Sequence, residues 1–135
     1  MGDHPADLLI GALSRRSGVH IETIRYYERI GLMPAPPRSH GGHRVYDRDH
    51  LKRLSFIHRS RRLGFSIQEI RDLLGLVEGD YTCGDVKTVV LDHLEDIRAK
   101  IADLKKLEST LLEFADLCDG GEAVACPIIN QLFDV

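Results

Sequence analysis

Three cysteines are the side chains of this sequence whose type and spacing could do chemistry. Cys118 and Cys126 frame a loop of seven residues, short enough for both sulfurs to face one ion, and Cys83 lies far earlier. Three cysteines cannot all pair within one chain, and a reducing compartment favours free thiols that bind metal or react. Thiolates are soft ligands that suit Hg(II), Cd(II), Pb(II), Zn(II) or Cu(I). The cysteines therefore predict a soft-metal site, and burial as small apolar side chains is the alternative.

Signals of enzymatic chemistry are missing from the sequence. It has no Gly-x-Ser-x-Gly, no phosphate-binding Gly-Lys-Ser/Thr loop and no His-Glu-x-x-His. A thiol enzyme needs a base near a cysteine, yet six of the seven histidines lie in the first 75 residues. We therefore expect that the chain is not an enzyme.

Charge divides the 135-residue chain into two unlike parts. Residues 1–75 carry 13 Lys and Arg against 8 Asp and Glu, whereas residues 76–135 carry 5 against 13. Twelve of the 13 cations in the first part are arginines, and the guanidinium fork suits both phosphates and base edges. The first part is therefore predicted to bind nucleic acid.

The segment 8–30 predicts a helix-turn-helix. Two short helices share apolar residues and are interrupted at Ser17-Gly18, and the second helix of such a motif enters the DNA major groove. A plain helical hairpin is the alternative. The exposed face of the second helix would carry Glu22, Thr23, Arg25, Tyr26 and Arg29.

A small β wing is predicted next, over residues 38–46. Gly41-Gly42 is a hairpin signal, and Arg38, His43 and Arg44 flank the turn, from which they could reach phosphates. A solvated basic loop is the alternative. A helix capped by Asp47 and running to about 63 follows, and a capping box at 66–69 opens another helix through 74.

A single long helix is predicted over 83–119, where there is no Pro and only one early Gly. Two series recur in it at seven-residue intervals: Cys83, Val90, Ile97, Leu104, Leu111 and Cys118, and then Leu94, Ile101, Glu108 and Ala115. Such a seam predicts a coiled coil and hence a homodimer. Packing of this helix within its own monomer is the alternative.

An antiparallel dimer would unite the cysteines. Thirty-five residues separate Cys83 from Cys118, or about 52 Å of helix, so the two cannot share an ion within one chain. Antiparallel pairing brings Cys83 of one subunit to Cys118 and Cys126 of the other. Two equivalent sites related by the twofold axis are then expected.

The predicted organisation is mainly α-helical. A winged helix-turn-helix DNA-binding domain (1–75) is followed by a linker (76–82), a coiled-coil dimerisation helix (83–119), and a metal-binding loop with a short terminal helix (120–135). No apolar run approaches the ~20 residues of a membrane span, and the start of the chain lacks the pattern of a signal peptide. A cytoplasmic protein without a membrane partner is therefore expected.

The sequence resembles the MerR family of metal-responsive transcription regulators over nearly its whole length. Ile10-Gly-Ala-Leu-Ser14, Gly18-Val and Glu22-Thr-Ile-Arg-Tyr-Tyr-Glu-Arg-Ile-Gly-Leu32 look like the family's helix-turn-helix. Arg38-x5-Arg44-Val-Tyr46 looks like its wing, and Arg62-Leu-Gly-Phe-Ser-Ile-Gln-Glu-Ile70 looks like its second wing region.

The resemblance implies a dimer that sits on a promoter with an overlong spacer. Such a dimer represses without metal and, with metal, bends and untwists the DNA so that RNA polymerase can align both of its recognition elements. Arg25, Tyr26, Arg38, His43, Arg44 and Arg61 match positions where the family contacts DNA. With Thr23, from the exposed face of the predicted second helix, they are the DNA-binding candidates.

The choice of metal rests on two opposed features. Cysteine at the start of the dimer helix, here Cys83, resembles the family's divalent-ion sensors, whereas the loop from Cys118 to Cys126 has the length typical of its monovalent sensors. A third thiolate changes the coordination more than one loop residue does. The sequence therefore favours Hg(II), with Zn(II), Cd(II) and Pb(II) open. A Cu(I) or Au(I) sensor and a thiol redox regulator are the alternatives.

Overall fold

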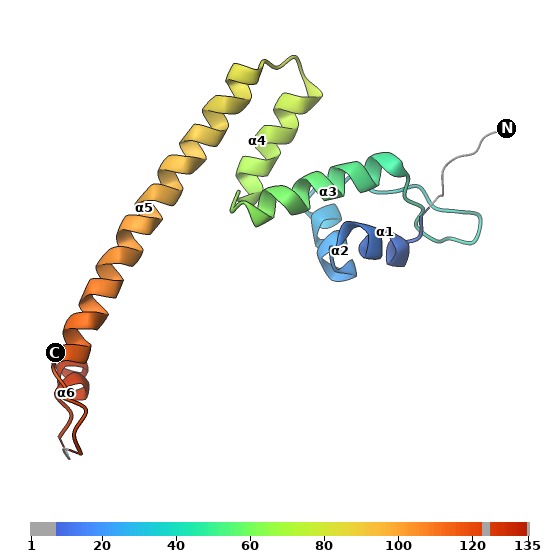
Figure 1. Cartoon of the computed structure of the whole chain (residues 1–135). Coiled ribbons are helices and arrows are strands. Elements are labelled where there is room, and N and C mark those ends of the chain that lie inside the picture. Colours follow the sequence, from blue (N-terminus) through green and yellow to red (C-terminus); the bar gives the residue numbers. More distant parts are fainter. Residues whose placement is uncertain (1–7, 123–124, 135) are drawn as a thin grey trace. The chain divides into compact units, whose positions relative to one another are not determined.

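A computed structural model describes residues 8–122 and 125–134. It is mainly helical, as predicted, and the described residues contain helices α1 to α6 (Figure 1). They separate into two compact units, one ending at Val86 and the other beginning at Lys87. The helices are α1 Ile10–Ser17, α2 Ile21–Arg29, α3 Arg48–Arg62, α4 Ile67–Glu78, α5 Cys83–Asp116 and α6 Pro127–Phe133.

The predicted break between α1 and α2 lies at Gly18. This residue adopts a left-handed conformation, with φ of 77°, which glycine reaches without the steric cost of a Cβ atom. Its N–H donates to the carbonyl of Ser14 at 2.9 Å, and the Ser14 hydroxyl donates to the carbonyl of Val19 at 2.6 Å. The turn thus closes one helix and sets the direction of the next.

A buried apolar core holds the first unit together. Leu13 of α1, Ile24 of α2 and Leu54 and Ile57 of α3 are fully inaccessible to solvent. Each side chain removed from water stabilises the fold by roughly 1.5–3 kcal/mol. The other buried apolar residues of this unit are Leu8, Val19, Tyr27, Leu32, Met33, Tyr46, Phe65, Ile70, Leu73 and Leu74.

The predicted β wing is a loop closed by one bridge. Arg38 and Arg44 form an isolated antiparallel bridge, and the N–H of Ser39 donates to the carbonyl of His43 at 2.7 Å. Gly42 makes the turn with φ of 79°. Three prolines at 34, 36 and 37 remove backbone donors just before the bridge, so a longer ladder cannot form there.

Helices α3 and α4 begin at the predicted caps. The Asp47 carboxylate accepts the N–H of His50 at 3.0 Å. Ser66 and Glu69 form the reciprocal capping box, with distances of 3.1 and 2.9 Å. Helix α4, however, continues to Glu78 instead of ending near Leu74.

The extension of α4 has a physical reason. Leu76, Val77 and Glu78 can all continue a helix, and the Arg53 guanidinium of α3 pairs with the Glu78 carboxylate. The chain leaves helical geometry only at Gly79. The segment predicted as a linker, 76–82, is therefore helical over its first three residues.

Helix α5 is continuous over 34 residues. Thr82 and Asp85 satisfy each other's backbone N–H groups at its start, at 2.9 and 3.2 Å. It ends at Asp116, three residues before the predicted end. No helix in the described part of the chain combines the length and apolar character of a membrane span.

Candidate nucleic-acid interface and metal site

The outer face of α2 presents the residues that the sequence predicts for DNA contact. Arg25 is about half-exposed and pairs with the still more exposed Glu22 at 3.1 Å. Tyr26 is 44% exposed, and the Arg29 guanidinium lies 5.8 Å from its ring centroid. Exposed ion pairs are weak, so Arg25 can exchange Glu22 for a base edge at little cost. Thr23 is half-buried on the same helix.

One hollow brings α2 and the wing together. Its lining includes four of the predicted DNA-binding residues, and it shows that side chains from two separate segments meet at one surface. Arg38 also donates to the carbonyl of Gly42 at 2.8 Å, which fixes the wing turn. The lining residues are Leu9, Ile10, Arg25, Arg38, Gly42, His43 and Arg44.

Arg44 has a structural role that the sequence reasoning missed. Its guanidinium pairs at 2.9 Å with Glu28 of α2, whose side chain is only 8% exposed. The Tyr46 hydroxyl donates to the other oxygen of the same carboxylate. Two wing residues thus converge on one buried carboxylate and attach the wing to α2. The signal available in the sequence was Glu28 itself, an acidic residue within a basic segment.

The environment of Tyr46 keeps its hydroxyl protonated. Burial, and then the hydrogen bond and charge of Glu28, raise the pKa of Tyr46 to about 12. The phenol therefore remains a hydrogen-bond donor even at a pH near the ordinary tyrosine pKa of about 10.

Arg61 lies outside this hollow, at the turn between α3 and α4. It is exposed, and its guanidinium donates to the carbonyl of Phe65 at 2.8 Å. Two other arginines serve the fold: Arg53 donates to the carbonyl of Leu32 at 2.9 Å, and Arg71 donates to the carbonyl of Ile30. They hold the end of the α2 segment against α3 and α4. Arginine content therefore overstates the number of DNA contacts.

The three cysteines are free thiols. Cys118 and Cys126 are both half-buried in the second unit, and Gly120, which lies between them in sequence, has a φ of 83°. Residues 123–124 of this loop lie outside the described residues. Cys126 caps α6, and Pro127 takes the first helical position.

Cys83 is exposed and is the first residue of α5. The 34 residues of α5 span about 51 Å, so Cys83 and Cys118 cannot bind the same ion within one chain. Two half-buried thiols that flank one short loop fit a soft ion by their donor chemistry. Within one chain, Cys118 and Cys126 are the thiols that could bind one soft ion together. Cys83 could join them only from a second chain.

Profiles of one family match two overlapping segments of this chain. The profile described as MerR HTH family regulatory protein matches residues 8–77, and the profile described as MerR, DNA binding matches residues 51–114. A mercuric resistance operon regulatory protein from Bacillus cereus is 43% identical over 125 residues, which cover 91% of this chain and 95% of that protein.

Two solved structures are similar over nearly the whole chain. The regulator PbrR691 from Ralstonia metallidurans CH34, in complex with lead(II), has a TM-score of 0.79 and 38% identity, and covers 93% of this chain and 98% of its own. MerR from Bacillus megaterium MB1, in complex with a mercury(II) ion, has a TM-score of 0.75 and 37% identity, and covers 94% and 100%.

The helix-turn-helix, the wing attached to it and the arginines on their common surface define a DNA-binding transcription regulator. The chain belongs to the MerR family. It is a metal-responsive regulator and not an enzyme.

Proposed function

We propose that this regulator represses its promoter without metal and activates it by distorting the DNA when a soft divalent ion binds, with Hg(II) favoured. The observation that carries the proposal is the placement of three free thiols, with Cys83 at the start of α5 and Cys118 and Cys126 in the segment after its end. The regulators of mercuric resistance and the mercury(II) complex among its relatives support the choice of ion. Its partners would be promoter DNA and RNA polymerase. We therefore place the protein in the cytoplasm in this proposal.

An antiparallel homodimer through α5 is part of the proposal. Leu104 and Leu111 are 63% and 65% exposed, and Val90 and Ile101 are 45% and 46% exposed. All four belong to the two predicted heptad series. A stripe of this kind on a long helix favours a partner helix, because its burial removes apolar surface from water. Leu107 and Leu112, outside the two series, are exposed as well.

Each metal site would then take Cys118 and Cys126 from one subunit and Cys83 from the second copy. When bound, the ion would supply coordinate bonds to thiolates that join the two subunits. The chain's own contribution is to hold two thiols on a short loop and to present the third at a helix start. Zn(II), Cd(II), Pb(II) and Cu(I) are the other candidate ions.

The proposed DNA contacts follow from exposure and position. Arg25 and Tyr26 on α2 would reach base edges, with Thr23 beside them. Arg38 and His43 on the wing and Arg61 at the second turn would contact phosphates. Arg44 would act mainly by positioning the wing through Glu28. The domain division of the proposal is a DNA-binding domain over 1–75, a dimerisation helix from 83, and a metal-binding loop with α6.

Subunit mixing tests the intersubunit site. A Cys83→Ser subunit is combined with a subunit that carries Cys118→Ser and Cys126→Ser. One site of the heterodimer then keeps all three thiolates and the other keeps none, whereas both sites of each parent homodimer are damaged. We expect tight Hg(II) binding to return at one ion per heterodimer, measured by titration with native mass spectrometry.

Three results would contradict this scheme. Tight binding of two ions by the Cys83→Ser homodimer would show that Cys118 and Cys126 suffice, as in a Cu(I) site. Confirmed heterodimers that recover no binding would exclude the antiparallel three-thiolate arrangement. Activation by an oxidant in the presence of a chelator would favour the thiol redox regulator.

A further inference from the structure

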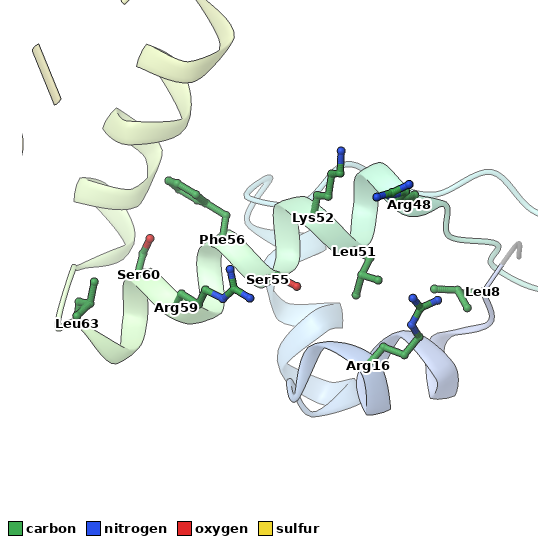
Figure 2. A pocket seen from close by; sticks show the side chains of 10 residues that line it. All are labelled: Leu8, Arg16, Arg48, Leu51, Lys52, Ser55, Phe56, Arg59, Ser60 and Leu63. Atoms are coloured by element: carbon green, nitrogen blue, oxygen red, sulfur yellow. The ribbon is translucent and has the colours of Figure 1, made fainter. Parts of the chain in front are cut away.

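A second hollow in the DNA-binding unit has no role in the function described so far. It has a volume of about 720 Å³ and shares no lining residue with the hollow between α2 and the wing. Figure 2 shows its side chains along α3, with Arg16 and Leu8 toward the Arg48 end and Leu63 at the opposite end. Its lining consists of Leu8, Arg16, Arg48, Leu51, Lys52, Ser55, Phe56, Arg59, Ser60 and Leu63.

The spacing of the lining residues makes this hollow a groove along one helix face. Eight of them belong to the segment from Arg48 to Leu63 and recur at intervals of three and four residues, which places them on one side of α3. Helix α3 has 15 residues and is therefore about 22 Å long. The groove is an elongated surface and not a small enclosed cavity.

Among the described residues, the charged side chains that line the groove are all cations: Arg16, Arg48, Lys52 and Arg59. All four cations are exposed. Within the described residues none of them forms an ion pair or a side-chain hydrogen bond, whereas Arg25, Arg38, Arg44, Arg53, Arg61 and Arg71 each have a partner.

Apolar side chains lie between these cations. Leu51 and Phe56 are half-buried, and Leu63 is 67% exposed. A DNA backbone offers phosphates to the cations but little apolar surface to these side chains. A small anion would need cations that converge on one point, whereas these extend along α3. The combination fits a polypeptide with both acidic and apolar side chains.

We propose that the α3 groove binds an acidic helical segment, with apolar side chains along one face, of a protein bound at the same promoter. The segment would lie along α3, with its carboxylates against the four cations and its apolar face against Leu51, Phe56 and Leu63. Complementary charge of this kind speeds association and selects the partner. This inference rests on the promoter role proposed above.

Charge reversal in the groove tests the proposal. Lys52→Glu combined with Arg59→Glu is made in the full-length protein, because both side chains are exposed and have no ion-pair partner among the described residues. RNA polymerase holoenzyme is the probe, and mobility shift measures its binding to the preformed complex of regulator and promoter DNA. We expect that binding to weaken about ten-fold, while the regulator's own affinity for the operator stays unchanged.

Matched variants make the result specific. Lys100→Glu with Lys106→Glu introduces the same charge change on exposed positions of α5 and should behave as the wild type. Lys52→Gln with Arg59→Gln removes the charges without reversing them and should give a smaller loss. A photo-reactive amino acid at the exposed position of Leu63 should crosslink to a polymerase peptide that contains acidic and apolar residues.

Two outcomes would overturn the groove as a protein-docking site. An equal loss of operator affinity, or a crosslink from position 63 to DNA, would make it a DNA-contact surface. Unchanged polymerase binding in the charge-reversal variant would leave it without this partner. The binding assay requires neither metal nor transcription. A failure of the proposed metal-dependent activation would appear in the wild-type protein, and it would therefore be distinguishable from a failure of the groove proposal.

Discussion

The first unit and helix α5 bury their apolar residues in opposite ways. In the first unit, Leu13, Ile24 and Leu54 are fully buried, and caps satisfy the starts of α3 and α4. Along α5, Leu104, Leu107 and Leu111 are 59–65% exposed. The first unit completes its core within one chain, whereas α5 leaves exposed the apolar stripe that the proposed dimer would cover. We therefore expect the first unit to fold independently of the proposed dimerisation through α5.

The largest effect is expected from breaking the stripe on α5. Leu104→Asp with Leu111→Asp would place charges in the proposed dimer seam, where an unpaired charge is costly. Sedimentation should then report a monomer, and specific operator binding should collapse because paired half-sites need paired modules. The helices of the first unit should remain folded, as measured by the helical circular dichroism signal of the variant. Lys105→Asp, outside the two heptad series, is the control, and a stable dimer of the double variant would refute the seam.

The next largest effect concerns the core of the first unit. Leu54→Ala removes a fully buried side chain and should lower the free energy of unfolding by about 2–5 kcal/mol. The same truncation at Leu104 should change mainly the concentration at which the dimer forms. Chemical denaturation at two protein concentrations separates these results. If the loss of unfolding free energy in Leu54→Ala depended on protein concentration, the core of the first unit would not be independent of dimerisation.

A smaller effect separates two kinds of arginine. Arg25→Ala should weaken operator binding by about 1–3 kcal/mol and relax discrimination at one base pair, if it reads a base edge. Arg61→Ala should weaken all sequences alike and reduce the salt dependence by about one phosphate contact. Anisotropy titrations over a range of salt, with operator and scrambled DNA, measure both. Unchanged affinity in both variants would remove them from the interface.

The smallest effect is a pH dependence from the wing attachment. The pKa of Tyr46 is raised to about 12, so its contribution to stability is complete below its ordinary pKa near 10 and is lost as the pH rises toward 12. The stability difference between the wild type and Tyr46→Phe should therefore shrink over this range. Urea unfolding at pH 9 and near pH 11 measures it, and a constant difference would contradict the shift.

Local signals carried most of the sequence-based prediction. The Gly18 turn, the Asp47 cap and the Ser66–Glu69 capping box depend on residues that are close in sequence, and their chemistry is specific. Contacts between distant residues were not predictable in the same way. The Arg53–Glu78 pair lengthens α4, and the Glu28–Arg44 pair gives a wing cation a structural partner. The periodicity of the sequence predicts neither of these two ion pairs.

The same difference between local and long-range contacts applies to the candidate sites. Exposure of Arg25 and Arg38 followed from their positions in the helix and the turn, and the structure places them in one hollow. Which exposed cations gather into the α3 groove depended on how α3 lies against α1, which no local pattern specifies. The joining of three thiols depends on a second chain, so the dimer and its metal site stay predictions until they are measured.

The backbone pairing of Leu8 with Tyr46 has a consequence for the order of folding. The two residues exchange both N–H···O bonds, at 2.7 and 2.8 Å, and so enclose α1, α2 and the wing in one closed loop. Closing a long loop costs entropy that its enclosed contacts must first offset. The bridge should therefore form after α1 and α2 have packed together, and its amides should exchange with solvent only through states in which that loop has opened.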